Sequence, residues 1–249
     1  MYLRFDKIAF AVFVLQSLFA NAQDQNYVPT YTQPPVAKTL NKNIAGKGIL
    51  SVQVLAGLSF DNIKPGILAI QGKTTKEVSV GLGGGLGIDA YVGKQLNKDF
   101  RFGVHVGFQR AGSEPVLKDA TVRFLRFFVM PMLNANIKIN DVSSINIGLG
   151  GYASFGSSFL VEPPKTDTSK ILKITYKPNI GMAFHVQYEA QVSDEVSFFA
   201  GLRFHWVTLE VDEVTLGGAK AILLPQGNST FNQINGGGVA LQFGLNYFF

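Results

Sequence analysis

Three histidines are the residues of this chain best suited to metal binding or to general acid–base chemistry. They are His105, His185 and His205. In the strand pattern described below all three face one interior, and because imidazole nitrogen is a common zinc ligand this arrangement would permit a metal site. Asp89, Glu189 and Arg203 share that interior face, and charged neighbours of this kind favour a structural role for the histidines. We therefore expect neither a metal site nor a catalytic site here, and no cofactor.

A glycine-rich tract from Gly81 to Gly87 invites comparison with nucleotide-binding loops. The G-x-G-x-x-G spacing fails, because Leu86 stands where the third glycine should be. No helix is expected after it, so helix-terminal amides could not bind a phosphate. The chain also lacks a G-x-S-x-G motif and an H-E-x-x-H motif. The sequence predicts that the protein is not an enzyme.

A two-residue alternation over positions 78–108 determines where these side chains lie. Even positions from 78 to 92 are apolar or glycine, and after a short break at 97–99 the same parity resumes at Phe100. The apolar set begins with Val78, Val80, Leu82, Leu86, Ile88, Ala90 and Val92. Successive side chains of a strand point to opposite faces, so this stretch predicts a hairpin with one apolar face. Its other face, mostly glycine with isolated charges, is typical of the crowded interior of a small barrel whose outside meets lipid.

The same alternation recurs along the chain and predicts eight strands. Their outward positions run over 50–60, 78–92, 100–108, 125–139, 145–155, 174–192, 196–206 and 239–249. An even number of strands fits an all-β, antiparallel, up-and-down transmembrane barrel. Pro131 falls inside the fourth strand, where proline cannot donate to the ladder, so we expect a bulge or a missing bond there.

Connection lengths alternate as well. The links 96–99, 140–143 and 193–195 are short, whereas 61–75, 111–121, 157–173 and 211–235 are long. Outer-membrane barrels have short periplasmic turns and longer extracellular loops, so both termini are expected in the periplasm. Eight strands leave an interior only wide enough for side chains, and Phe128, Met130 and Tyr152 would fill it.

The N-terminal residues resemble a processing segment. Arg4 and Lys7 precede an apolar stretch over 8–20, and Ala20-Asn21-Ala22 fits the rule for cleavage after small residues. We expect a cleavable signal peptide at 1–22, a flexible periplasmic extension at 23–47 and one barrel domain at 48–249. The 249 residues include no cysteine, so disulfides are excluded, and the net charge of +5 is too small to indicate nucleic acid.

The last strand resembles the closing-strand signal that the barrel assembly machinery reads in bacterial outer-membrane proteins. Its outward residues include Leu241, Phe243, Leu245, Tyr247 and Phe249. The segments 124–133 and 148–152 are similar to the fourth and fifth strands of PorT-like barrels of Bacteroidetes outer membranes. Those barrels usually carry a leucine-glutamate-isoleucine-proline type segment, where this chain has Arg126 in place of the acidic residue. The resemblance implies an outer-membrane location and an accessory role in secretion.

The interior charges are expected to form one structural network. A hairpin that turns about Asn97 would set Asp89 opposite His105, and one that turns about Asp194 would set His185 opposite Arg203. Glu189 lies two inward positions from His185. Such a network would stabilise the wall of the barrel, because a charge in a dry interior is costly unless it is paired.

The longest connection carries exposed apolar residues that suggest a contact site, with extension of the flanking strands as the alternative. These residues are Leu216, Ile222, Leu223, Leu224 and Phe231. We expect a non-catalytic accessory or scaffold of envelope transport or secretion. Its partners would be outer-membrane lipid, the barrel assembly machinery during biogenesis and an envelope protein complex. Two alternatives stay open: a surface receptor or adhesin that acts through the long loops, and a lipid-modifying enzyme, which inward-facing histidines fit poorly.

Overall fold

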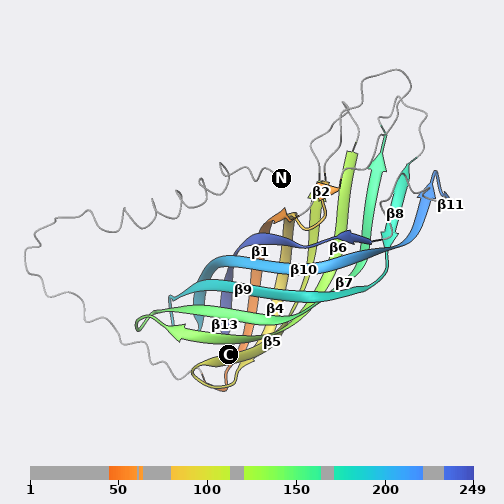
Figure 1. Ribbon diagram of the computed structural model, residues 1–249. Coiled ribbons are helices and arrows are strands. Elements are labelled where there is room, and N and C mark those ends of the chain that lie inside the picture. Colours follow the sequence, from red (N-terminus) through yellow and green to blue (C-terminus); the bar gives the residue numbers. More distant parts are fainter. Residues whose placement is uncertain (1–44, 61, 64–79, 113–120, 164–170, 221–232) are drawn as a thin grey trace, which may run out of the picture. The chain divides into compact units, whose positions relative to one another are not determined.

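Antiparallel strands dominate the computed structural model, which describes residues 45–60, 62–63, 80–112, 121–163, 171–220 and 233–249 (Figure 1). Eight strands form the wall: β1 (Gly48–Ser59), β4 (Gly85–Gln95), β5 (Phe100–Gly112), β6 (Thr121–Lys138), β7 (Ser143–Glu162), β9 (Asn179–Gln191), β10 (Val196–Leu216) and β13 (Gly238–Phe248). The other described strands are short: β2 (Asn62–Ile63), β3 (Val80–Gly81), β8 (Leu172–Tyr176), β11 (Ala219–Lys220) and β12 (Gln233–Asn235).

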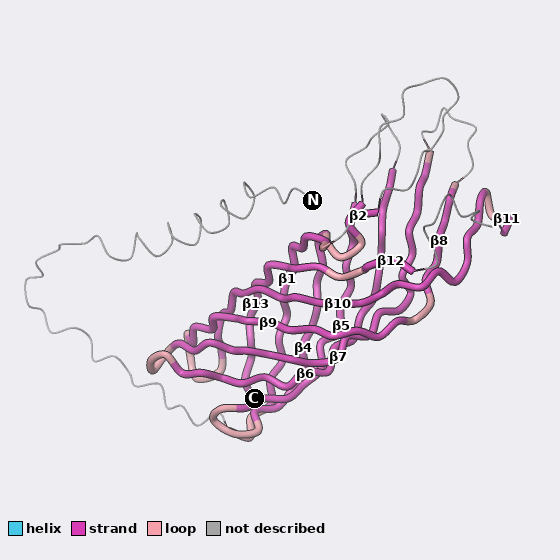
Figure 2. Tube along the Cα trace, in the orientation of Figure 1, coloured by secondary structure: helices cyan, strands magenta, loops and turns pink. Residues whose placement is uncertain are grey.

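The wall closes on itself. Each strand pairs antiparallel with its neighbours in the order β1, β4, β5, β6, β7, β9, β10, β13. The last strand pairs back to the first, from Ile49 opposite Phe248 to Ser59 opposite Gly238 (Figure 2). Closure removes the free edges that an open sheet would expose. The prediction of an all-β, eight-stranded antiparallel barrel is confirmed.

The two faces of the wall differ as the alternation predicts. Outward residues such as Val52, Ile88 and Phe243 are each about half exposed, at 53%, 53% and 50%. Inward residues are buried and largely polar, and Arg126, Ser197 and Gln242 have no exposed surface at all. The barrel therefore has an apolar outside and a polar inside, the reverse of a water-soluble domain.

The sequence pattern placed Leu82 on the outward face before β4, and this prediction is wrong. This side chain is fully buried, because β4 begins only at Gly85 and the residues before it turn into the barrel. Gly85 has φ of +101°, which L side chains rarely adopt, and this reverses the alternation. A Cβ at Gly83 would overlap the Gly237 carbonyl, so the turn packs directly on the connection before β13.

The sequence pattern also placed Tyr176 on the lipid side of the sixth predicted strand, and this prediction is wrong. Tyr176 is 4% exposed and packs edge-on against Phe124, with ring centroids 6.0 Å apart. The predicted strand is two strands, because Lys177 and Pro178 separate β8 from β9. Proline offers no amide hydrogen for the ladder, so the parity of one strand does not carry into the next.

The connection expected over 157–173 is partly strand. β7 continues to Glu162 and pairs with β8, which in turn pairs with β10. In Figure 1 these segments stand at the end of the barrel opposite the C-terminus. The register of β6 against β7 shifts between Leu125 and Phe127, opposite Gly156 with φ of +59°. This bulge turns Phe159 and Val161 inward, where both are buried.

Around Pro131 the ladder pairs Val129 with Ala153 and Met132 with Gly150 but skips the residues between them. The register is unchanged, so the proline leaves a gap in the pairing without a bulge, one of the two outcomes expected for it.

The predicted signal peptide at 1–22 and most of the extension at 23–47 lie outside the described residues. Residues 40–249 form one compact unit. In the described ranges no helix is long and apolar enough to cross a membrane.

Candidate functional site

The middle of the interior is crossed by a buried charge cluster. Arg203 Nη1 on β10 donates to Asp89 Oδ2 on β4 at 2.6 Å, and Asp89 Oδ1 lies 3.1 Å from His105 Nδ1 on β5. Gln53 Nε2 on β1 also donates to the Asp89 carboxylate. All four side chains are at least nine-tenths buried. Because β4 and β10 are not neighbours in the wall, the Asp89–Arg203 ion pair links separate strands across the lumen.

The register of the first hairpin differs from the expected one. His105 lies opposite Tyr91, and Asp89 lies opposite Gly107, because the turn is centred on Lys98 instead of Asn97. Asp89 and His105 are therefore diagonal neighbours, still within contact distance. In the other hairpin Arg203 lies opposite His185, as the turn about Asp194 predicts.

Glu189 belongs to a second cluster, nearer the short turns. Its Oε2 accepts from Arg101 Nη2 at 2.9 Å, and its Oε1 accepts from Ser197 Oγ at 2.6 Å. Asn246 Nδ2 donates to the same serine oxygen at 3.1 Å. Sequence reasoning placed Arg101 on the inward face but missed its pairing, since β5 and β9 are not adjacent in the wall.

Arg126 forms a third cluster, at the end of the lumen away from the C-terminus. Its guanidinium donates to Gln109 Oε1 at 3.0 Å and to the Gly236 carbonyl at 2.8 Å, and it lies 2.6 Å from His205 Nε2. It also stacks 5.4 Å from the centre of the Tyr152 ring. Across the described ranges no carboxylate pairs with this guanidinium, although the residue is fully buried.

The three histidines are thus divided between clusters. The rings of His105 and His185 have centroids 6.0 Å apart, whereas His205 lies with Arg126 and Tyr152. His185 Nε2 instead contacts Asn146 Oδ1 at 3.2 Å. Within the part of the chain that the structure describes, no three histidine or acidic side chains converge as a metal site requires.

Between the charged clusters the lumen is filled by apolar bulk. Phe128, Met130 and Met132 are at most 1% exposed, and Phe128 stacks on Tyr152 with centroids 5.5 Å apart. The cavity beside Tyr91, His105 and His185 measures about 10 Å³, close to the volume of one water.

This filling predicts the electrical behaviour of the barrel. We expect the purified protein to give no large, steady single-channel current in planar lipid bilayers, since ions would have to displace buried side chains. The same bilayer without added protein gives the baseline. Stable currents that scale with salt concentration would contradict the prediction.

The structure describes the whole closing strand but only part of the longest predicted loop. The outward residues of β13, which include Leu241 to Tyr247, are exposed between β1 and β10. Leu216 ends β10 and is exposed, so the predicted connection 211–235 begins as strand. Gly217 and Gly218, with φ of +60° and +83°, form a two-residue hairpin turn into β11. The remaining predicted contact residues, Ile222, Leu223, Leu224 and Phe231, lie outside the described residues.

No family model and no curated protein matches this chain. Among solved structures it is similar to Ail, the attachment invasion locus protein of Yersinia pestis, at 11% identity over 82% of this chain and 99% of that one, with a TM-score of 0.41. The outer membrane protein OprG of Pseudomonas aeruginosa gives 11% identity, 82% and 96% coverage and a TM-score of 0.46. Neisserial surface protein A gives 13% identity, 82% and 97% coverage and a TM-score of 0.42. At such identities the likeness concerns the fold alone, and the resemblance to PorT-like barrels stays a prediction.

Proposed function

We propose that this chain is an integral β-barrel of a bacterial outer membrane, with its apolar wall in the lipid. The observation that carries the proposal is the exposed apolar surface around a closed barrel, with polar residues buried inside. In water so large an apolar surface would drive aggregation. In a bilayer it is favourable, and closure leaves no free strand edge in the wall.

We further propose a non-catalytic accessory or scaffold role in envelope transport or secretion. The PorT-like resemblance of residues 124–133 and 148–152 suggests this role. The interior supports a non-catalytic role, because the buried charges of Asp89 and Arg203, and those of Arg101 and Glu189, are paired with each other across the lumen. A receptor or adhesin that acts through the long loops is the alternative, and exposed Leu216 beside the predicted loop favours it.

Cell fractionation tests the proposed membrane location, and affinity purification from detergent tests the proposed accessory role. The chain should fractionate with the outer membrane, migrate differently in gels before and after heating, and recover a stable envelope complex. Recovery in the soluble fraction would contradict the membrane location. A chain that lacks Gly217 to Gly227, cut at the glycine turn, separates the roles: loss of surface binding with the complex intact would favour the receptor.

Truncation of the closing strand should prevent assembly. Removal of Tyr247 to Phe249 deletes the pairing of Tyr247 with Leu50 and Val196, and also the bond from the Phe249 amide to the Gly48 carbonyl at 3.0 Å. Because these residues join both neighbours of β13, we expect loss of most of the heat-modifiable protein from the outer membrane.

The matched control for this truncation is Val192→Ala, which shortens another exposed apolar side chain near a short turn. It should leave the level of heat-modifiable protein unchanged. Normal membrane levels of the truncated chain, with the gel shift retained, would show that the last residues are dispensable.

A further inference from the structure

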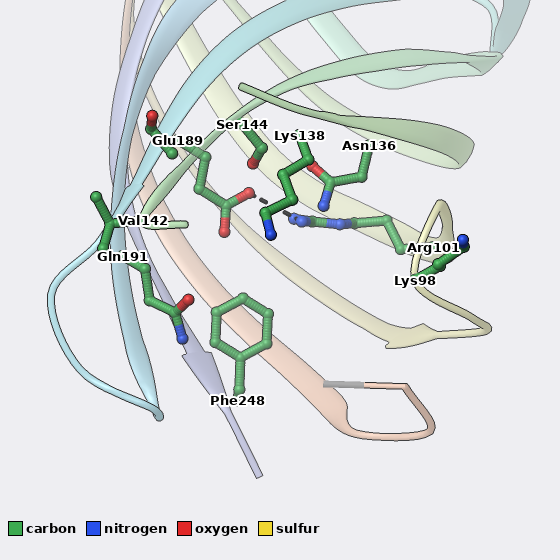
Figure 3. Close-up of a pocket in the computed structure, with 10 residues that line it drawn as sticks. Lys98, Arg101, Asn136, Lys138, Val142, Ser144, Glu189, Gln191 and Phe248 are labelled. Atoms are coloured by element: carbon green, nitrogen blue, oxygen red, sulfur yellow. Dashed lines mark hydrogen bonds and ion pairs between the residues drawn. The ribbon is translucent and has the colours of Figure 1, made fainter. Parts of the chain in front are cut away.

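A cavity of about 260 Å³ opens at the end of the barrel that carries the short turns (Figure 3). Six of the residues that line it carry the argument: Lys98, Arg101, Lys138, Val142, Glu189 and Phe248. Its volume lies just below the roughly 300–1,000 Å³ of pockets for drug-sized ligands, so it suits a small molecule. It is separate from the apolar bulk that fills the middle of the lumen.

The side chains around this cavity carry more positive than negative charge. Lys98, Arg101 and Lys138 contribute three positive charges, and Glu189 contributes the negative one. Both oxygens of that carboxylate are already engaged, one by Arg101 and the other by Ser197. Glu189 therefore does not neutralise the two lysines, and the cavity keeps a positive potential.

The ion pair that Lys138 already forms is weak and would compete little with a ligand. Its ammonium lies 2.8 Å from the Asp141 carboxylate, but both side chains are more than half exposed. Exposed ion pairs of this type contribute about 0–1 kcal/mol, so an anion inside the cavity could replace Asp141 as the partner. In Figure 3 the Lys138 side chain extends between Glu189 and Phe248, into the space that a ligand would occupy.

A buried donor points to a ligand independently of the charge. Arg101 Nε has no hydrogen-bond partner within the described part of the chain, and the residue is 4% exposed. A buried donor without a partner costs about 1–3 kcal/mol, which an acceptor oxygen would recover. Native structures leave few such groups without a reason.

The backbone around the cavity is fixed by local hydrogen bonds. The Ser143 amide donates to Asn140 Oδ1 at 2.8 Å, and its carbonyl accepts from the Ile139 amide at 3.0 Å. On the other rim, the Asn136 amide donates to the Asp99 carbonyl at 2.6 Å, which holds the turn with Lys98 against β6. A ligand would therefore meet donors that are already in place.

We propose that this cavity binds a small oxyanion, a carboxylate or phosphate group, held by Lys98 and Lys138 and by a hydrogen bond from Arg101 Nε. The Phe248 ring and Val142 supply an apolar wall for the carbon skeleton of the ligand. The site stands on the geometry of the barrel alone, so its test is independent of the role proposed above.

The test is titration of the purified full-length barrel in detergent with inorganic phosphate and, separately, with acetate, followed by backbone amide NMR. We expect saturable shifts at the Lys98 and Lys138 amides and at least a tenfold loss of affinity in Lys138→Glu. The stronger of the two probes identifies the oxyanion class. Higher ionic strength should weaken both.

Lys94→Glu is the matched control, because Lys94 lies at the same end of the barrel but is exposed on the outward face of β4. It should bind as the wild type does. Absence of saturable shifts with both probes would overturn the proposal, as would equal affinities in Lys138→Glu and the wild type. If Lys138→Glu does not assemble, Lys98→Ala answers the same question, since this exposed turn residue makes no contact that the fold needs.

Discussion

Replacement of Asp89 with asparagine should lower the free energy of unfolding of the barrel by roughly 3–5 kcal/mol, the cost of breaking a buried ion pair from one side. The Asp89 carboxylate is the partner of Arg203 at 2.6 Å, and both side chains are at most 2% exposed. Asparagine would leave the guanidinium without a counter-charge in a dry interior. Arg203→Met should cost a similar amount, because it leaves the carboxylate with only His105 and Gln53.

Urea unfolding in detergent, followed by tryptophan fluorescence and by the gel shift, measures both variants. Arg123→Met is the matched control: it breaks a 2.9 Å pair with Glu162 that is about one-third exposed, so we expect a loss of at most about 1 kcal/mol. The double variant Asp89→Asn/Arg203→Met should lose less than the sum of the single variants, since the two residues are coupled. Wild-type stability in both single variants, together with loss of complex formation, would identify the cluster as a functional site.

The wall of the barrel was predictable from sequence because a strand imposes a period of two on a chain with one apolar face. The parity of β6, with Phe127 and Leu133 out and Arg126 and Met130 in, follows from that rule alone. The predictions failed where the backbone leaves the ladder. Leu82 precedes the positive φ of Gly85, and Tyr176 precedes Pro178.

The interior clusters were predictable only as a set of inward residues. Parity places Asp89, Arg101, Glu189 and Arg203 inside, but contacts across the lumen depend on how the strands tilt and stagger on closure. Hairpin register therefore suggested His185 as the neighbour of Glu189, whereas its partner is Arg101 from β5. For the same reason, the sequence showed Arg126 only as a departure from a family pattern, and its contacts across the lumen were not predicted.

Arg126→Glu is the substitution that we expect to damage assembly most. The guanidinium is a donor surrounded by acceptors: Gln109 Oε1 and the Gly236 and Gly83 carbonyls. Through these bonds it ties the turn before β4 to the connection before β13. A glutamate would present carboxylate oxygens to the same acceptors and bury a negative charge without a partner, a combination that buried sites do not tolerate. An acidic residue at this position would therefore be unfavourable in this chain.

Comparison with Arg126→Met separates the effect of the lost hydrogen-bond donors on stability from the effect of the added negative charge. Methionine fills similar space but takes the Arg126 donors from Gln109 Oε1 and the Gly236 carbonyl, at about 1–3 kcal/mol for each that water cannot reach, whereas the Gly83 carbonyl still accepts from Gln109 Nε2. The loss is partly offset because no charge is buried. We expect stability to fall in the order wild type, Arg126→Met, Arg126→Glu, measured by urea midpoint and by heat-modifiable protein in the membrane. Arg110→Glu, the same charge reversal at an exposed residue of β5, should leave both measures unchanged. A stably assembled Arg126→Glu barrel would mean that the two segments are held in place without this guanidinium.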